Sequence, residues 1–296
     1  MPVALSLGLG ACEAPAPLPA GLAGTLVFVS NRSGREDLYA RPLPGEAEIR
    51  LTWLDEPPRD PAVSADGARV AFTVGGRVAV VDLATHDVRY LTLGIDYADA
   101  GPSWHPDGRR LVVAGRRGEG EAADLFELSA DGAGPESPRR VLLESPAHEG
   151  EPVYSPDGSF LVFVREDNLF RLDLGSGGTR RLTGGFRRAR QPRFLPSGRL
   201  LCLWSEEKRY GIDLLQADGA DRQTLVEGQV RYENVAPSPD GRYLVASDAY
   251  DLGFAPAEFL TRRGNTRLWL LDQRGGVVAP LSRGYRHSSH SAVWGH

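Results

Sequence analysis

Charged, aromatic and imidazole side chains recur in short segments that each precede an x-Pro-x-x pattern. Such side chains can hold a polar partner or a peptide through ion pairs and aromatic contacts, although polar loops alone would show the same composition. We interpret the segments together as one binding surface for a protein or peptide. The predicted partner-binding residues are Arg59, Asp99, His148, Glu149, Arg188, Arg190, Arg231, Tyr232, Glu233 and His290.

The histidines near the C-terminus raise the question of a metal site. His287 and His290 have the spacing His-x2-His, and His296 ends the sequence. Two imidazoles supply two nitrogen ligands, whereas a zinc site needs a third protein ligand, for which His148 is the candidate. We expect surface histidines, no bound metal and no cofactor. A metal-dependent enzyme acting on a sugar or a lactone is the alternative hypothesis.

Other catalytic signatures are missing from the sequence. It contains no Gly-x-Ser-x-Gly nucleophile motif and no phosphate-binding Gly-x4-Gly-Lys motif. Carboxylates are plentiful, so a pair such as Glu149 and Glu151 stays open as a catalytic pair, but no feature singles it out. We therefore assign no catalytic residue and expect a binding module rather than an enzyme. A structural or sensor domain without a small ligand is a third hypothesis.

The overall composition narrows the classes of partner. Charged residues make up 25% of the 296 residues and the formal net charge is −5, so no nucleic-acid partner is expected. No run of 18 or more apolar residues exists that could form a membrane-spanning helix. The contents of 35 glycines and 22 prolines are typical of a turn-dense all-β protein. We expect a monomer.

A four-residue turn recurs along the chain and indicates what positions these segments. Full copies of Ser-Pro-Asp-Gly begin at Ser155 and Ser238, and variants begin at Ser64, His105 and Leu195. Proline presets φ for the second position of a type I turn, and Ser and Gly suit the first and the last position. Because the five turns lie about 40 to 50 residues apart, they predict a repeat whose unit is a four-stranded blade.

The segments around the turns predict the strands of each blade. Continuous apolar runs such as 161–164 follow the turns, as expected for strands buried on both faces. Residues 25–29 look like a second strand without an innermost strand before it, and residues 291–294 look like an innermost strand with nothing after it. We therefore predict an all-β, six-bladed β-propeller over residues 22–296. Its blades are four-stranded and antiparallel, and its last blade is closed by the N- and C-terminal strands. The polar segments then meet at one mouth of the channel.

The blade sequences resemble those of the TolB family. The resemblance rests on residues 28–39, Phe-Val-Ser-Asn-Arg-Ser-Gly-Arg-Glu-Asp-Leu-Tyr, and on the x-Pro-x-x-Ser-Pro-Asp-Gly turns, and it covers residues 24–296. It implies a six-bladed propeller of the cell envelope that engages a protein partner. TolB itself carries an additional N-terminal α/β domain, which we expect this sequence to lack.

The first 21 residues form a separate predicted segment. Residues 3–11 are small and apolar and end in Leu-Gly-Ala before Cys12, which resembles a bacterial lipobox with Cys12 as the lipidated residue. A Pro- and Ala-rich tether follows. We expect a location in the periplasm or at the outer membrane, with contact to a membrane only through this lipid anchor. Cys202, by contrast, lies in the apolar run 200–204 and is expected to be a buried, unpaired side chain.

Overall fold

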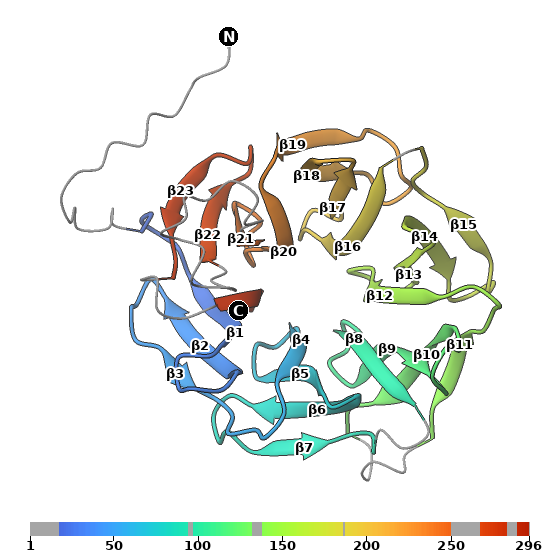
Figure 1. Ribbon diagram of the computed structural model, residues 1–296, viewed down its shortest axis with the longest axis horizontal. Coiled ribbons are helices and arrows are strands. Elements are labelled where there is room, and N and C mark those ends of the chain that lie inside the picture. Colours follow the sequence, from blue (N-terminus) through green and yellow to red (C-terminus); the bar gives the residue numbers. More distant parts are fainter. Residues whose placement is uncertain are drawn as a thin grey trace.

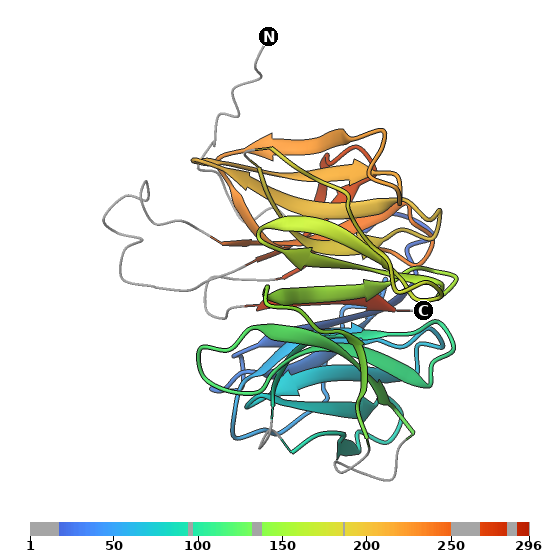
Figure 2. The same ribbon diagram turned by 90° about the vertical axis from the view of Figure 1, so that its right-hand side faces the viewer.

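The protein is an all-β, six-bladed propeller in a computed structural model that describes residues 18–93, 97–131, 138–185, 187–249, 267–282 and 289–295. Its six four-stranded antiparallel sheets are arranged radially around a central axis (Figure 1). The turned view shows that the blades form one ring of similar height (Figure 2). The predicted number of blades and of strands per blade is therefore confirmed.

The strands of each blade are given in order from the axis outward. Blade 1 takes its innermost strand from the C-terminal end of the chain. Blade 1 consists of β24 (Ser289–Gly295), β1 (Gly24–Ser30), β2 (Asp37–Leu43) and β3 (Ile49–Arg50), and blade 2 of β4 (Pro58–Val63), β5 (Arg69–Val74), β6 (Arg77–Asp82) and β7 (Val88–Tyr90). Blade 3 consists of β8 (Ala98–Trp104), β9 (Arg110–Arg116), β10 (Ala123–Ser129) and β11 (Arg140–Leu143), and blade 4 of β12 (Glu149–Tyr154), β13 (Phe160–Arg165), β14 (Asn168–Asp173) and β15 (Thr179–Arg181). Blade 5 consists of β16 (Arg188–Phe194), β17 (Leu200–Glu206), β18 (Arg209–Leu215) and β19 (Gln223–Gly228), and blade 6 of β20 (Arg231–Pro237), β21 (Tyr243–Ala249), β22 (Arg267–Asp272) and β23 (Val277–Pro280).

The hydrophobic core lies between the blades rather than inside any one of them. One cluster, for example, joins Val27 and Leu38 of blade 1 to Val70 and Phe72 of blade 2, all of them fully buried. The middle strands therefore bury both faces, which explains their continuous apolar runs. The outermost strands carry mostly exposed or half-buried residues, as in β15. Cys202 is buried and unpaired as predicted, and burial raises the pKa of its thiol to about 12.

The two ends of the described chain meet in blade 1. Strand β24 pairs antiparallel with β1, with Leu26 opposite Trp294 and Thr25 opposite Gly295. Figure 1 shows the red C-terminal strand beside the blue N-terminal strand. The Trp294 indole is buried, and its Nε1 donates a hydrogen bond to the carbonyl oxygen of Ala23 at 3.1 Å. The predicted closure by both terminal strands is confirmed.

The recurring turn is held by its own side chains. In blade 4 the Ser155 hydroxyl donates to Asp157 Oδ1 at 2.6 Å and accepts from the Phe160 amide at 3.1 Å. The hydrogen bond from Ser155 is the main cause that lowers the pKa of Asp157 to about 2. The charged carboxylate therefore stabilises the turn above the ordinary pKa of 3.8, and this stabilisation is lost as the pH falls towards 2. The motif is structural, since it binds its own backbone.

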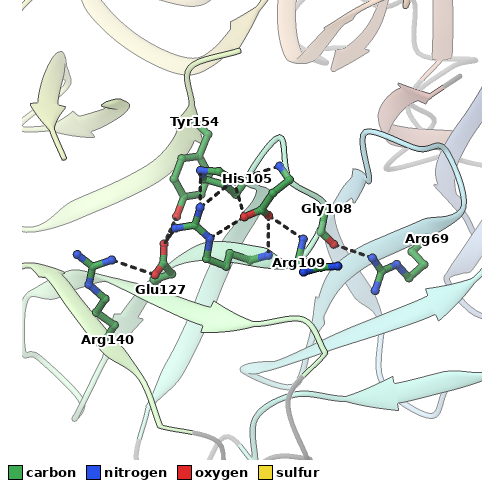
Figure 3. Close-up of polar contacts among 9 residues, drawn as sticks. Arg69, His105, Gly108, Arg109, Glu127, Arg140 and Tyr154 are labelled. Carbon is green, nitrogen blue, oxygen red and sulfur yellow. Dashed lines mark hydrogen bonds and ion pairs between the residues drawn. The ribbon is translucent and has the colours of Figure 1, made fainter. Parts of the chain in front are cut away.

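The turn of blade 3 has His105 in place of serine and forms a larger polar network that reaches into blade 4 (Figure 3). Arg110 contacts both ring nitrogens of His105 and donates to Glu127 at 3.1 Å. Glu127 also accepts from the Tyr154 hydroxyl at 2.9 Å and from Arg140 at 3.2 Å. Glu127 is buried, so this carboxylate connects blade 3 to the inner strand of blade 4 through groups removed from solvent.

Several sequence predictions concern residues outside the described ranges. These are the lipobox-like segment with Cys12 and the histidines His287 and His296. Within the described ranges no helix is long and apolar enough to cross a membrane.

Candidate functional site

Five of the six inner strands contain one residue in the left-handed backbone region, at the point where the strand faces the axis. These residues are Asp60, Gly101, Glu151, Gln191 and Ser291, with φ between +49° and +58°. Each one lies in a register shift of its strand pair or, for Ser291, directly beside one, and four of them precede the repeat's proline. We call these five residues the belt. Left-handed residues are costly outside glycine, and they often accompany functional sites.

A cavity of about 700 Å³ opens where the inner strands of blades 1, 2, 4, 5 and 6 begin. These strand starts and the hairpin between β17 and β18 belong to one face of the ring. Seven of the ten predicted partner-binding residues line it, namely Arg59, Arg188, Arg190, Arg231, Tyr232, Glu233 and His290. The structure therefore brings together residues that are up to about 230 positions apart in the sequence. We call this cavity the mouth cavity.

Cations dominate one side of the mouth cavity. Arg188 and Arg190 both lie close to Asp167, with nitrogen–oxygen distances of 3.5 and 3.7 Å, and their side chains are 66% and 54% exposed. Arg231 has no ion-pair partner within the described part of the chain. Two of the three guanidinium groups thus share one carboxylate, Asp167, and four glutamates also line the cavity.

Aromatic side chains form the wall behind these arginines. Trp204 is buried, its ring lies 3.8 Å from the Arg187 guanidinium carbon, and its Nε1 has no hydrogen-bond partner among the described residues. It is in contact with Gly211 of the next strand, where an added Cβ would lie 2.7 Å from the indole. Burial raises the pKa of Tyr232, which therefore stays a neutral donor or acceptor. Two further aromatic rings, Tyr210 and Tyr232, line this cavity.

A second, smaller cavity of about 360 Å³ lies beside the mouth cavity, between the inner strands of blades 2, 3, 4 and 5. We call it the belt cavity, because four belt residues line it: Asp60, Gly101, Glu151 and Gln191. Two predicted residues, Asp99 and His148, line it as well, together with Arg116 and Arg193. Glu151 and Gln191 line both cavities, so the two spaces are adjacent.

The carboxylates of Asp99 and Glu149 are engaged within the blades. Asp99 is fully buried and makes a bidentate ion pair with Arg139 at 2.6 and 2.8 Å. Glu149 is buried beside Arg165, with Arg165 Nε at 2.8 Å from Oε1, and desolvation raises its pKa. The pair proposed from sequence, Glu149 and Glu151, is split, since only Glu151 lines a cavity. Both buried carboxylates reinforce their blades, so a partner would reach them only by displacing an arginine.

The set of predicted partner-binding residues does not include several residues that line the two cavities. Glu151 and Gln191 hold the position directly before the repeat's proline, and Arg193 follows that proline. The repeat could therefore have predicted these residues, because side chains at equivalent positions of different blades face the same central axis. Burial lowers the pKa of Arg193, and the nearby carboxylates of Glu151 and Asp60 oppose this effect. Trp204 could not have been predicted in this way, since an apolar run contains it.

Two of the metal-ligand candidates, His148 and His290, lie within the described ranges. Within the described ranges no three His, Cys, Asp or Glu side chains are arranged to hold a metal. His148 accepts the Ala123 amide on Nδ1 at 3.2 Å, and His290 Nε2 lies 3.1 Å from Glu36 Oε1. The two histidines thus have separate protein partners in different blades.

Comparison with known proteins shows which propellers this ring of blades is similar to. A TolB homolog of Chlorobium luteolum is 30% identical over 161 residues, which are 52% of this chain and 35% of that protein. The crystal structure of TolB from Acinetobacter baumannii superposes with a TM-score of 0.76 at 16% identity, over 94% of this chain and 68% of that one. The chain is a TolB-like β-propeller. No family model matches it.

Other similar structures share only the fold of this TolB-like propeller. An oligogalacturonate lyase in complex with manganese has a TM-score of 0.61 at 16% identity, over 86% of this chain and 73% of that one. The TolB-like chain spans about a third of the length of the curated TolB homologs that it matches. Their similarity therefore establishes the type of propeller.

Proposed function

We propose that this TolB-like propeller is a non-catalytic binding protein of the bacterial cell envelope, which holds a protein or peptide partner at the mouth cavity. The observation that carries the proposal is the convergence of seven predicted residues, from four blades, on one cavity of about 700 Å³. Arginine, tyrosine and tryptophan are the residue types that most often dominate binding energy at protein interfaces. All three types line this cavity.

The charge distribution favours a partner with acidic side chains. Arg188, Arg190 and Arg231 stand together at the cavity, while the formal net charge of the whole chain is −5. A local positive surface attracts and orients an approaching acidic segment, whereas the rest of an acidic protein repels it. Binding should therefore weaken as the salt concentration rises.

Reversing the three charges is expected to remove partner capture without unfolding the protein. The variant Arg188→Glu/Arg190→Glu/Arg231→Glu should capture at least about tenfold less partner from envelope extracts, because three exposed guanidinium groups become carboxylates. Capture is measured by quantitative mass spectrometry of pull-downs, and the fold by circular dichroism. The matched control is Arg109→Glu/Arg180→Glu/Arg274→Glu, which changes three exposed arginines away from the cavity. Equal capture by both triple variants would refute binding at this face.

The location in the envelope is part of the same proposal. The lipobox-like segment before Cys12 supports export and lipid attachment, and the propeller would then follow a short tether as a monomer in the periplasm or at the outer membrane. Mass spectrometry of the protein purified from its native host should find an acylated Cys12 as the first residue. An intact, unmodified Met1 would contradict lipidation and leave the binding proposal to be tested separately.

The alternative, a metal-dependent enzyme acting on a sugar or lactone, has less support. The described residues gather no set of three metal ligands, and the likeness to the manganese-bound lyase concerns the fold alone. The mouth cavity instead offers charged side chains of both signs and aromatic rings, which suit recognition of a polypeptide.

A further inference from the structure

Belt side chains connect one blade to the next by hydrogen bonds to the backbone. The Asp60 carboxylate of blade 2 accepts the amide of Gly101 in blade 3 at 3.3 Å. The Glu151 carboxylate of blade 4 accepts the amide of Gln191 in blade 5 at 2.6 Å. The same contact thus recurs about 40 residues apart, from one belt residue to the next along the ring.

Between these two contacts the belt has a gap at Gly101. Gly101 has the backbone conformation of its neighbours in the belt, with φ +58°, but it has no side chain to reach blade 4. A Cβ placed on it would lie 3.7 Å from the Glu151 amide nitrogen and 3.5 Å from the Glu151 Cα. The missing side chain would therefore point at the Glu151 amide, the counterpart of the amides that Asp60 and Glu151 bind. Gly101 and Glu151 both line the belt cavity.

Two guanidinium groups line the cavity around this gap. Arg116 lines the belt cavity and has no ion-pair partner within the described residues. Arg193 lines it too, and its guanidinium donates to the carbonyl of Pro192 at 2.9 Å. Three carboxylates line the cavity as well: Asp60 and Glu151 each accept a backbone amide and lie near Arg193, and Asp99 holds Arg139. An added carboxylate would thus meet a backbone donor and two guanidinium groups.

We propose that the belt cavity binds a carboxylate group of a ligand, which takes the place of the missing side chain at Gly101 and accepts the Glu151 amide. Arg116 and Arg193 would neutralise its charge. The carboxylate belongs either to a small organic acid or to the acidic side chain of a peptide, and the two sources share this chemistry. The proposal depends on the belt cavity alone, so its test is independent of partner capture at the mouth cavity.

The first experiment measures binding of defined probes by calorimetry and by thermal shift at constant ionic strength. The probes are acetate, the blocked peptide Ac-Gly-Asp-Gly-NH2 and its amide counterpart Ac-Gly-Asn-Gly-NH2. We expect the Asp peptide to bind at least about tenfold more tightly than the Asn peptide, because a hydrogen bond to a charged group is stronger than one to a neutral group. Binding of acetate as well would indicate that a small acid suffices, and binding of the Asp peptide alone would indicate a peptide side chain. Binding of neither would overturn the proposal.

The second experiment closes the gap from within. The variant Gly101→Asp should lose carboxylate binding by about tenfold or more, because its own carboxylate would occupy the site as Asp60 does one blade earlier. The control Gly177→Asp makes the same change at a left-handed glycine with no atom within 4 Å of the added Cβ, and it should bind as the parent does. Undiminished binding by Gly101→Asp would overturn the proposal.

A third variant keeps the test decisive if Gly101→Asp does not fold. Arg116→Gln removes one cation that lines the cavity and has no described ion pair, so the fold should be preserved and affinity for the Asp peptide reduced about tenfold. In the opposite direction, Asp60→Gly opens a second gap, and acetate should raise its melting temperature more than that of the parent. An unchanged affinity in Arg116→Gln together with no acetate effect in Asp60→Gly would overturn the proposal.

Discussion

Replacing Trp294 with alanine is expected to lower the free energy of unfolding by about 4 kcal/mol, the upper range for deletion of a buried aromatic side chain. Trp294 is 8% exposed and lies on β24, the only strand of blade 1 that comes from the C-terminal end of the chain. Its loss removes both the apolar contact with the core between blades 1 and 6 and the hydrogen bond to Ala23. The measurement is urea unfolding followed by circular dichroism and tryptophan fluorescence.

The matched control is Trp53→Ala. Trp53 is 66% exposed and contacts the Arg50 guanidinium at 5.2 Å from the ring centre, so its removal should cost less than about 1 kcal/mol. If both tryptophan variants unfold at the same urea concentration, β24 contributes little to closure of the ring. That result would contradict the role assigned to blade 1.

Replacing Glu127 with alanine is expected to lower the free energy of unfolding by about 3 kcal/mol, as for other buried ion pairs that lose one partner. The variant leaves the buried Tyr154 hydroxyl without its acceptor and deprives Arg110 and Arg140 of a shared carboxylate (Figure 3). Burial and the nearby Glu127 raise the pKa of Tyr154, so this hydroxyl remains a donor that needs an acceptor. The effect is again measured by urea unfolding.

A double-mutant cycle separates this cause from a general loss of packing. Tyr154→Phe removes the donor, so Glu127→Ala should cost at least about 1 kcal/mol less when it is combined with Tyr154→Phe than when it is made alone. The exposed Glu144 of the same blade serves as the control, and Glu144→Ala should leave stability within about 0.5 kcal/mol. Additive effects of Glu127→Ala and Tyr154→Phe would show that the two side chains act independently.

The repeat made most of the fold predictable from sequence. Five turns of one type fixed the number of complete blades, and the unmatched segments 25–29 and 291–294 predicted the composite blade. The third strand of blade 5, β18, was not predicted, because Gly211 and Asp213 interrupt its apolar pattern. Gly211 is explained by packing against Trp204, and Asp213 by burial beside Arg222 and Thr224. The contacts that explain both residues are made by neighbouring strands, so the sequence of β18 alone does not indicate them.

The candidate site was predictable as a face but less so residue by residue. Their position next to the repeat's inner strand correctly predicted that Arg188, Arg190 and Arg231 lie together, at one cavity. It did not distinguish Glu149, which points into the blade towards Arg165, from Glu151, which lines both cavities. Glu151 has a left-handed backbone, which turns its side chain to a different side from that of Glu149. The sequence does not indicate this conformation, since residues before proline more often adopt an extended backbone.

The composite blade also has a consequence for biosynthesis. Strand β1 is among the first segments to leave the ribosome, and its partner β24 is the last described strand to do so. Blade 1 therefore lacks its inner strand throughout translation, whereas blades 2 to 6 can each form as soon as their own residues have emerged. Pairing of segments so distant in sequence is slow, because a long loop must close first. A nascent chain of this design remains an open arc until β24 has emerged, with the edge of β1 that faces the axis unpaired.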